Sequence, residues 1–387
     1  MDEHQYLDQM AALLPGIEAR VDDTEQLRRI PDATIKELRD SGLMKALQPA
    51  RWGGAELDPI VAYRAARMLG SVCGSTGWVY GILVVHPWHL ALFPEQAQEE
   101  VWGDDDRELI ASTYAPLGQV QKVEGGFRLS GHWPWSSGTD HCKWVFLGGV
   151  EQGDPARPDM RAFLLPRSDY RIEDTWHAEG LRGTGTNDIV VEDAFVPEYR
   201  TLSYVDTSAL DCPGNRLNTA PIYRLPFGSV FPLTIHAAAL GIAFGMLDAY
   251  RDSVAERIKL AYGEAARDDP YSQIHLAQFS STLDAAWLQM ERNIGVLTER
   301  VKRGEALGVV DRARLRHDQV YGLARVLEVA DQCFSASGGN AIRRGHPLQR
   351  FWRDLHAARQ HAINEYELGA VLYGKALLGL EIDGPMF

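Results

Sequence analysis

The sequence predicts an α+β fold, mainly α, in which an N-terminal helical domain, a central β-barrel or sandwich and a C-terminal helical bundle follow one another. Three observations predict this order. Apolar residues recur at helical spacing over roughly the first hundred residues, short runs of alternating polarity begin near Leu109, and four long amphipathic patterns follow an irregular stretch after Val205. We therefore expect three domains, at residues 1–108, 109–205 and 206–387, which suits a chain of 387 residues.

The N-terminal domain is expected to be helical. In the segment 30–47, Pro31 and Asp32 open a helix whose apolar residues fall on one stripe, and Gly and Pro residues then end it. A second helix is expected over 60–72. The third, over 77–93, is apolar nearly all round, which predicts a helix buried in the core.

The central domain shows the two-residue period of β-strands. This period appears in the runs 125–133, 143–150, 161–166 and 187–197. Between about Asp206 and Gly228 no regular period is visible. The long helical patterns of the bundle then cover residues 231–262, 272–303, 311–337 and 347–380.

Composition and charge exclude several classes of partner. The formal net charge is −14 and the pI is about 5.3, and no segment supplies the basic stripe that phosphate groups require. Neither nucleic acid nor an anionic membrane is therefore expected. The N-terminus lacks the layout of an export signal, and no uninterrupted apolar stretch reaches the ~20 residues of a membrane span.

The cysteines indicate a reducing compartment. Cys73, Cys142, Cys212 and Cys333 lie far apart, without the spacing of a zinc site or a redox pair. We expect a soluble, cytoplasmic protein. No H-E-x-x-H motif, G-x-S-x-G elbow or G-x-G-x-x-G after a strand occurs, so no metal site, serine hydrolase or nicotinamide-binding unit is predicted.

Two segments carry a resemblance to a known family. GLRGTGTNDIVVEDAFVP (180–197) is similar to the strand pair that closes the β-domain of the acyl-CoA dehydrogenase superfamily. FSASGGNAIRRGHPLQRFWRDLHAARQH (334–361) is similar to the bundle segment of that superfamily, with its Gly-Gly turn and Arg-Asp pair. The resemblance spans essentially the whole chain. It implies an acyl-CoA dehydrogenase-like fold with a central β-barrel, a C-terminal four-helix bundle and a homotetrameric assembly.

Shorter motifs resemble one branch of that superfamily. CGSTGWV, VHPWHLALF, STYAP, WPWSSGTDH and RFWRD look like the two-component flavin-dependent monooxygenases. The resemblance implies the oxygenase component of an aromatic hydroxylase, which uses reduced flavin (FMNH2 or FADH2) and O2 through a C4a-hydroperoxyflavin. An NAD(P)H:flavin reductase is then the expected partner. A bulky steroid-derived phenol is the first expected substrate, with a polycyclic polyketide or an indole as alternatives.

One position separates this branch from the dehydrogenases. A dehydrogenase carries a catalytic Glu a few residues beyond its Arg-Asp pair, and here His361 stands close to that place, with Glu365 one turn later. The resemblance implies that His361 stabilises the flavin hydroperoxide, because an imidazole can hydrogen-bond a peroxide that a carboxylate would repel. Two alternatives stay open: a dehydrogenase that uses Glu365 as its base, and a flavin-binding homologue without activity.

His86 and Ser112 are expected at the substrate. An unpaired imidazole in an apolar helix is costly, so His86 needs a polar partner. The resemblance implies that this partner is a substrate hydroxyl, and a backbone carbonyl is the alternative. His89 is expected to be an ordinary core histidine. The resemblance places Ser112, at the start of the β-domain, in the lining of the pocket.

Three further residues are expected to contact the flavin ring. The resemblance places Ser137 beside N5 of the flavin, where a hydrogen bond would slow the loss of peroxide. Trp78 and Trp135 could pack against the apolar surface of the ring, and ordinary core packing is the alternative for both.

The Gly-Thr-Gly-Thr run is the last expected contact. Gly183 and Thr184 in this run are expected to offer backbone N–H and hydroxyl groups to the pyrimidine edge or the phosphate of the flavin. Trp176 and Arg182 are expected to flank the loop.

Overall fold

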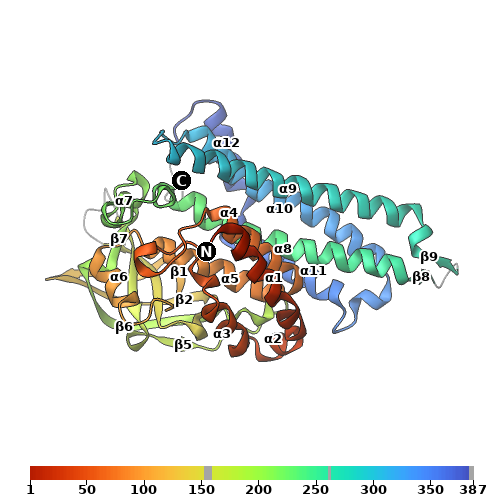
Figure 1. Cartoon of the computed structure of the whole chain (residues 1–387), viewed down its shortest axis with the longest axis horizontal. Helices are drawn as coiled ribbons and strands as arrows, with labels where there is room; N and C mark the ends of the chain where they lie inside the picture. Colours follow the sequence, from red (N-terminus) through yellow and green to blue (C-terminus); the bar gives the residue numbers. More distant parts are fainter. Residues whose placement is uncertain (152–158, 260–262, 383–387) are drawn as a thin grey trace.

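The structure, a computed structural model, describes residues 1–151, 159–259 and 263–382. A helical part, a β-sheet and a long helical bundle follow one another along the chain (Figure 1). The α+β, mainly α class predicted from the sequence is confirmed.

The N-terminal part is helical, as predicted. Its helices are α1 (Glu3–Ala19), α2 (Val21–Leu27), α3 (Asp32–Asp40), α4 (Pro59–Val72), α5 (Gly74–Leu90) and α6 (Glu95–Trp102). Every residue of α5 is buried, which fits its apolar sequence. Helix α5 packs against α4 on one side and against strand β1 on another, so it lies between the helical part and the sheet.

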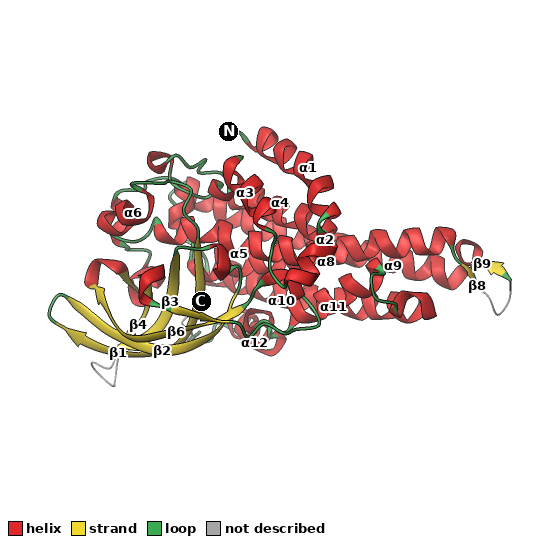
Figure 2. Cartoon of the chain, turned by 90° about the horizontal axis from the view of Figure 1, so that it is seen from below, coloured by secondary structure: helices red, strands yellow, loops and turns green. Residues whose placement is uncertain are grey.

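The central part forms one seven-stranded mixed sheet with the strand order β5-β6-β2-β1-β3-β4-β7. Its strands are β1 (Ile110–Val123), β2 (Gly126–Ser136), β3 (Trp144–Glu151), β4 (Asp159–Pro166), β5 (Arg171–Glu173), β6 (Asn187–Pro197) and β7 (Thr201–Ser203). The β1 and β3 strands pair in parallel and the other neighbours are antiparallel. The sheet is curved (Figure 2), and β4 contacts β6 across it.

The C-terminal part contains the bundle. Its helices are α7 (Tyr204–Ala209), α8 (Phe227–Glu256), α9 (Pro270–Lys302), α10 (Val309–Ala336), α11 (Pro347–Arg359) and α12 (Tyr366–Leu377). A short hairpin of β8 (Ile258–Lys259) and β9 (Glu264–Ala265), which the sequence did not predict, joins α8 to α9. The pattern predicted over 231–262 thus ends at Glu256, and residues 260–262 lie outside the described residues.

The last predicted helix is wrong in one respect. The pattern over 347–380 forms two helices, α11 and α12, separated by the 3-10 turn η11 (Ala362–Asn364). Side chains explain the break: the Asn364 amide donates to the Ala358 carbonyl (2.8 Å), and Arg359 donates to the Asn364 carbonyl (2.6 Å). These bonds replace the backbone pairs that a continuous helix would make.

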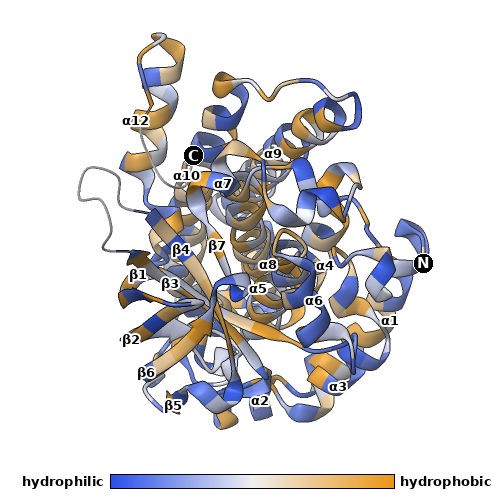
Figure 3. Cartoon of the chain, turned by 90° about the vertical axis from the view of Figure 1, so that its left-hand side faces the viewer, coloured by the Kyte–Doolittle hydropathy of each residue, from blue (hydrophilic) through white to orange (hydrophobic). Residues whose placement is uncertain are grey.

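Helix α8 is long and apolar enough to cross a membrane by length and composition alone. Of its most apolar stretch, 89% is buried inside the protein. Figure 3 shows α5 and α8 in the interior, with the other elements around them. The two helices form the core on which the candidate site is built.

Candidate active site

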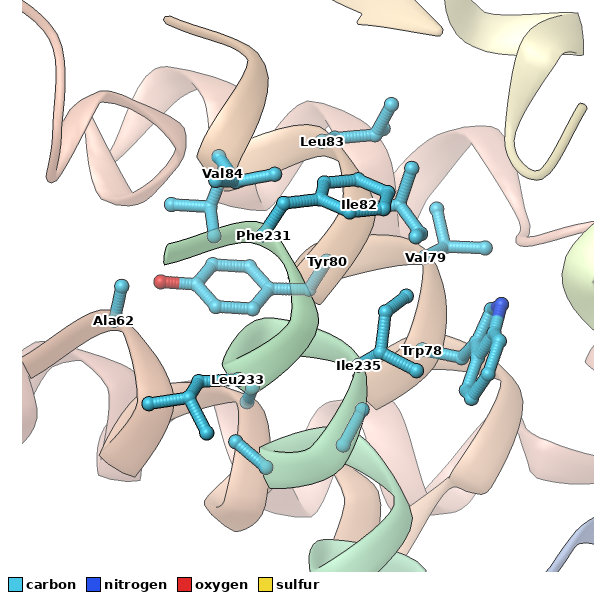
Figure 4. Packing of buried hydrophobic residues seen from close by; sticks show 14 of the residues in the cluster. Ala62, Trp78, Val79, Tyr80, Ile82, Leu83, Val84, Phe231, Leu233 and Ile235 are labelled. Carbon is cyan, nitrogen blue, oxygen red and sulfur yellow. The ribbon is translucent and has the colours of Figure 1, made fainter. Parts of the chain in front are cut away.

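One side of α5 carries the candidate site. Ser75, Trp78, Ile82, His86 and His89 follow one another at intervals of three or four residues, so they form a single stripe along the helix. All of them are buried. Figure 4 shows Trp78 and Ile82 of this stripe close to the α8 residues Phe231 and Ile235. Two clusters of side chains meet the stripe, one at Trp78 and one at His86.

The first cluster, called the serine subsite, is a chain of hydrogen bonds. The Trp78 indole N–H donates to the Ser137 hydroxyl, with 3.2 Å between the two atoms. The Ser137 hydroxyl also bonds the Thr186 hydroxyl (2.9 Å), which bonds the Thr184 hydroxyl (2.5 Å). The Thr184 hydroxyl donates to the Leu181 carbonyl (2.9 Å). Trp78, Ser137 and Thr184, each expected at the flavin, therefore lie together.

Trp135 lies apart from the serine subsite. The pairing of β2 with β6 shifts register between Trp133 and Ser136, and Trp135 within this bulge has a φ of +70°. Its side chain is 68% exposed, whereas that of Trp78 is 5% exposed. Ordinary core packing is therefore excluded for Trp135, and its ring takes no part in the hydrogen-bond chain of Trp78.

The loop that carries the two threonines is held against two helices, α11 and α5. The Leu181 N–H donates to Asp354 of α11 (2.6 Å), and the Gly183 N–H donates to Ser75 of α5 (3.1 Å). A Cβ atom on Gly180 would stand 2.1 Å from the Arg353 carbonyl oxygen, so only glycine lets the loop approach α11 this closely. The structure thus fixes the loop from both sides.

The backbone donors of this loop bond other parts of the protein. The N–H of Gly183 goes to Ser75, that of Thr184 to the Leu181 carbonyl (3.2 Å), and that of Gly185 to the Arg28 carbonyl (2.9 Å). These N–H groups thus have partners within the protein, and the expectation that Gly183 and Thr184 contact the flavin stays a prediction. These groups hold the loop, and through it the serine subsite.

Trp176 and Arg182 flank the loop, as expected. The Trp176 indole N–H donates to the Leu181 carbonyl (2.9 Å). Arg182 begins the 3-10 turn η5 (Arg182–Thr184), and its buried Nε atom has no hydrogen-bond partner among the described residues.

His361 reaches the serine subsite from the break between α11 and α12. Its ring lies 5.7 Å from the Trp78 ring, centroid to centroid. The Ile363 N–H donates to its Nδ1 atom (3.2 Å), so Nδ1 is an acceptor. In a neutral imidazole the proton must then sit on Nε2, which makes Nε2 a donor.

Burial and a nearby cation keep His361 neutral. Burial lowers its pKa to about 4, and the positive charge of Arg316 contributes in the same direction. Arg316 itself is only 5% exposed, and burial lowers its pKa to about 10. It donates to the Gln319 side chain and to the Ile363 carbonyl (3.0 Å), so α10 positions the turn that presents His361.

Glu365, the alternative base, points elsewhere. It is exposed at the start of α12, and no hydrogen bond or ion pair of its side chain is found in the described residues. The ring beside Trp78 is that of His361. The geometry thus gives the imidazole, and not a carboxylate, the position facing this subsite.

The second cluster, called the aromatic subsite, surrounds His86. Its Nδ1 atom lies 2.5 Å from the Ile110 carbonyl oxygen, which can only accept, so Nδ1 carries the proton. The Nε2 atom is buried and has no hydrogen-bond partner among the described residues. Burial lowers the pKa of His86 to about 4, which keeps the ring neutral. Nε2 is therefore a free acceptor in a dry, apolar place.

Strand β1 supplies the opposite side of the aromatic subsite. Ser112 and Tyr114 are two residues apart, so both side chains point to the face that α5 covers. Ser112 is buried, and the Tyr114 hydroxyl lies 2.8 Å from Nδ1 of His89. His89, expected to be an ordinary core histidine, thus has a tyrosine partner.

Aromatic rings complete this subsite. Rings within about 6 Å of His86, His89 or Tyr114 come from β3 and α8 and from the turn after α5, and α7 adds a ring behind them. They are Phe93, Phe146, Phe227 and Phe231, with Tyr204 against Phe227. Sequence reasoning missed this wall because its members are far apart in the chain. The alternation that points Ser112 inward also points Tyr114 inward, and that signal was present.

Other hollows and clusters do not compete with this site. A surface hollow of about 450 Å³ between α3 and the start of β3 is lined by charged residues that pair with one another, among them Lys36 with Asp40 and Arg107 with Asp105. Within residues 1–151, 159–259 and 263–382, no group of three or more His, Cys, Asp or Glu side chains is placed to hold a metal ion.

Comparisons with known proteins agree with this geometry. Family profiles described as acyl-CoA dehydrogenase N-terminal and C-terminal domains match residues 2–104 and 233–366. The flavin-dependent monooxygenase oxygenase subunit HsaA of Rhodococcus jostii (strain RHA1) is 46% identical, over 98% of this chain and 100% of its own length. The oxygenase component of the FADH(2)-dependent resorcinol hydroxylase of Rhizobium sp. (strain MTP-10005) is 32% identical, over 93% of this chain and 91% of its own.

A solved structure matches equally well. The crystal structure of 3-HSA hydroxylase from Rhodococcus sp. RHA1 superposes with a TM-score of 0.95 at 46% identity, and the match covers 100% of both chains.

Proposed function

This chain belongs to the acyl-CoA dehydrogenase family, as an oxygenase component of its flavin-dependent aromatic hydroxylases, and we propose that its substrate is a bulky phenol. The observation that carries this proposal is the free Nε2 acceptor of His86 inside a wall of aromatic rings. Such a group suits a ring that bears a hydroxyl donor. Relatives named as a resorcinol hydroxylase and a p-hydroxyphenylacetate 3-hydroxylase support a phenolic substrate.

The serine subsite fits a reduced flavin. A flavin ring needs flat apolar surface and a few polar partners at its edge, and Trp78, the Ser137 hydroxyl and the Nε2–H of His361 supply both. When bound, reduced flavin supplies the two electrons with which O2 is split and one oxygen atom is transferred to the ring. We propose FADH2 or FMNH2 as the flavin, delivered by a separate NAD(P)H:flavin reductase.

His361 acts as a neutral donor. With its pKa near 4 the ring carries one proton at pH 7, and the Ile363 N–H directs that proton to Nε2. It therefore donates a hydrogen bond toward the reacting oxygen without adding a full positive charge. The Ser137 hydroxyl would hold an edge of the flavin ring, and the buried side chains around it would exclude water.

His86 polarises the phenol and does not fully deprotonate it. A phenol has a pKa of about 10, so complete transfer of its proton to an imidazole with a pKa near 4 would cost about 8 kcal/mol. A hydrogen bond from the phenol to Nε2 avoids this cost and still raises the electron density at the ring carbon beside the hydroxyl. Ser112, on the facing strand, is placed to orient the substrate.

An oxygen-labelling assay tests the proposed function. Protein, chemically reduced FMN or FAD, ¹⁸O₂ and a panel of phenols that includes steroid-derived ones are mixed, and the products are analysed by mass spectrometry. The proposal predicts one ¹⁸O atom in a hydroxylated product. Oxidation of an acyl thioester without incorporation of label would support the dehydrogenase alternative and overturn the proposal.

We also propose a homotetramer in the cytoplasm. Several large apolar residues of α12 and the turn after it are exposed, namely Leu368, Val371, Leu377 and Leu378, and apolar patches of this kind favour subunit contacts. All four cysteines are free and buried, which fits a reducing compartment. Light scattering on the purified protein distinguishes a tetramer from a dimer or monomer.

A further inference from the structure

The hydroxyl chain of the serine subsite has only one arrangement of its protons. Each hydroxyl has a single proton to give. The Leu181 carbonyl can only accept, so the Thr184 hydroxyl donates its proton to that carbonyl. The bond between Thr184 and Thr186 must then be donated by Thr186, and the bond between Thr186 and Ser137 must be donated by Ser137.

The direction of this chain decides what Ser137 can offer a ligand. Its proton is committed to Thr186, and its oxygen already accepts from the Trp78 indole N–H. The lone pair that remains can only accept. Ser137 therefore presents an acceptor to whatever lies beside it, although a serine hydroxyl alone could present either.

We propose that Thr184 and Thr186 make the flavin site select the reduced form, by fixing the Ser137 oxygen as an acceptor for the N5–H group. This inference rests on the proposed function and takes the flavin N5 to lie beside Ser137, as the family resemblance implies. Reduced flavin carries a hydrogen on N5 and is a donor there. Oxidised flavin has a bare N5 that can only accept, so it meets the Ser137 oxygen with two acceptors and no proton between them.

Rotation of the Ser137 hydroxyl toward oxidised flavin would form one hydrogen bond and lose another. If Ser137 turned its proton toward oxidised flavin, its contact with Thr186 would lose its proton, because the Thr186 proton already goes to Thr184. All three hydroxyl groups are buried, so no water restores the lost bond. One hydrogen bond lost in such a place corresponds to about a tenfold change in affinity. Thr184 and Thr186 are positioning residues in this scheme, since they act through Ser137.

The test measures binding and not turnover. Dissociation constants of oxidised and of reduced FMN and FAD are determined by anaerobic titration for the wild type, Thr184→Val and Thr186→Val. Either substitution frees the Ser137 proton, so oxidised flavin should bind about tenfold more tightly, while the affinity for reduced flavin changes little. The ratio of the two constants then falls about tenfold, which shifts the two-electron potential of the bound flavin by about 30 mV.

Matched variants guard against a loss of structure. Thr139→Val makes the same change at an equally buried threonine outside the chain, and it should leave the ratio within twofold of the wild type. Thr186→Ser keeps a hydroxyl and should restore the wild-type ratio. If Thr184→Val and Thr186→Val leave the ratio unchanged, or weaken both flavin forms equally, the inference is overturned.

Ser137→Ala separates this inference from the proposed function. If it alters flavin binding while the threonine variants do not, Ser137 contacts the flavin and only the proton direction was wrong. If neither flavin form binds, or if Ser137→Ala changes neither constant, the placement of the flavin itself is refuted.

Discussion

The two nitrogen atoms of His86 have different roles, and the sequence alone could not divide them. The two alternatives for this residue were a carbonyl partner and a substrate partner. The structure gives the carbonyl of Ile110 to Nδ1 and leaves Nε2 without a partner among the described residues. The carbonyl contact is found, and it fixes the tautomer in which Nε2 is free to accept, whereas a substrate hydroxyl at Nε2 stays a prediction.

Replacement of His86 tests its place at the substrate. We expect His86→Ala to lower the hydroxylated product formed per flavin oxidised by about tenfold to a hundredfold, because the phenol loses its acceptor. The dissociation constant of reduced flavin should change less than twofold, since the serine subsite is intact. His132→Ala, at an exposed histidine of strand β2, is the control. An unchanged product yield in His86→Ala would remove His86 from the site.

Arg316 is a residue that the sequence did not single out. It lies in a bundle helix whose pattern predicts only packing, and its contact with the Ile363 carbonyl appears only when the break before α12 is known. Its charge lowers the pKa of both His361 and His236. A buried guanidinium thereby affects the candidate donor, His361, from a distant part of the sequence.

Arg316→Met should raise the pKa of His361. A nearby positive charge disfavours the imidazolium ion, so its removal favours protonation, although burial, the larger cause, still holds the pKa below 6.5. The acid limb of the pH profile of product yield should therefore move to higher pH. Arg325→Met, on the same helix, is the matched control. A shift toward lower pH, or an equal shift in both variants, would contradict this role.

At the scale of elements, the sequence predicted periodic segments well and junctions poorly. Helices α9 and α10 and strand β6 follow their predicted ranges within about two residues, because long runs of one period leave little choice. The break at η11 carries neither Gly nor Pro. It depends on the side chains of Asn364 and Arg359 and on partners in α10, which a local pattern does not contain.

The loop before β6 is a second junction whose contacts a local sequence pattern does not predict. Its glycines and threonines were expected at the flavin, and that expectation stays a prediction. The Leu181 and Gly183 N–H groups go to α11 and α5, which contact the loop only in the folded chain. The donors of the loop were for that reason not predictable.

Gly180→Ala should disturb both edges of the serine subsite. The added methyl group would meet the Arg353 carbonyl oxygen at 2.1 Å. The backbone of the loop or of α11 would have to shift to remove this clash, which costs free energy. We expect unfolding to be easier by about 1–3 kcal/mol and reduced flavin to bind at least tenfold more weakly. Urea denaturation and anaerobic flavin titration measure the two effects.

Gly16→Ala provides the comparison for this substitution. Its methyl group would meet only the flexible end of Arg20, at 3.6 Å, in the exposed part of α1. Since alanine favours helix, stability should stay equal or rise. Equal behaviour of the two variants would show that the loop does not depend on its contact with α11.

On the scale of the whole molecule, buried histidines should make the protein sensitive to acid. Burial lowers the pKa of His86, His361 and His236 to about 4, 4 and 3. These groups take up protons more readily in the unfolded chain, whose histidines titrate near 6.5. Their contribution to stability is thus complete above pH 6.5 and is lost as the pH falls toward 4.

Asp354 works in the opposite direction. Burial raises its pKa to about 7, so it favours the folded state more as the pH falls below 7. Because several histidines oppose this one carboxyl, we expect the free energy of unfolding in urea to decrease between pH 7 and pH 5. His236→Asn should make that decrease smaller. A free energy that rises toward pH 5 would show that the histidines do not dominate.

The stripe on α5 has a consequence for how enzymes of this shape can diversify. Trp78 and His86 stand eight positions apart on one rigid helix, which is about 12 Å along its axis. Under the proposed function, the distance between the flavin and the substrate ring is then set by the rise of the helix. Insertions or exchanges in the α7 region and its neighbouring turns can enlarge the aromatic subsite for a larger substrate, while the distance between the flavin and the substrate ring stays constant.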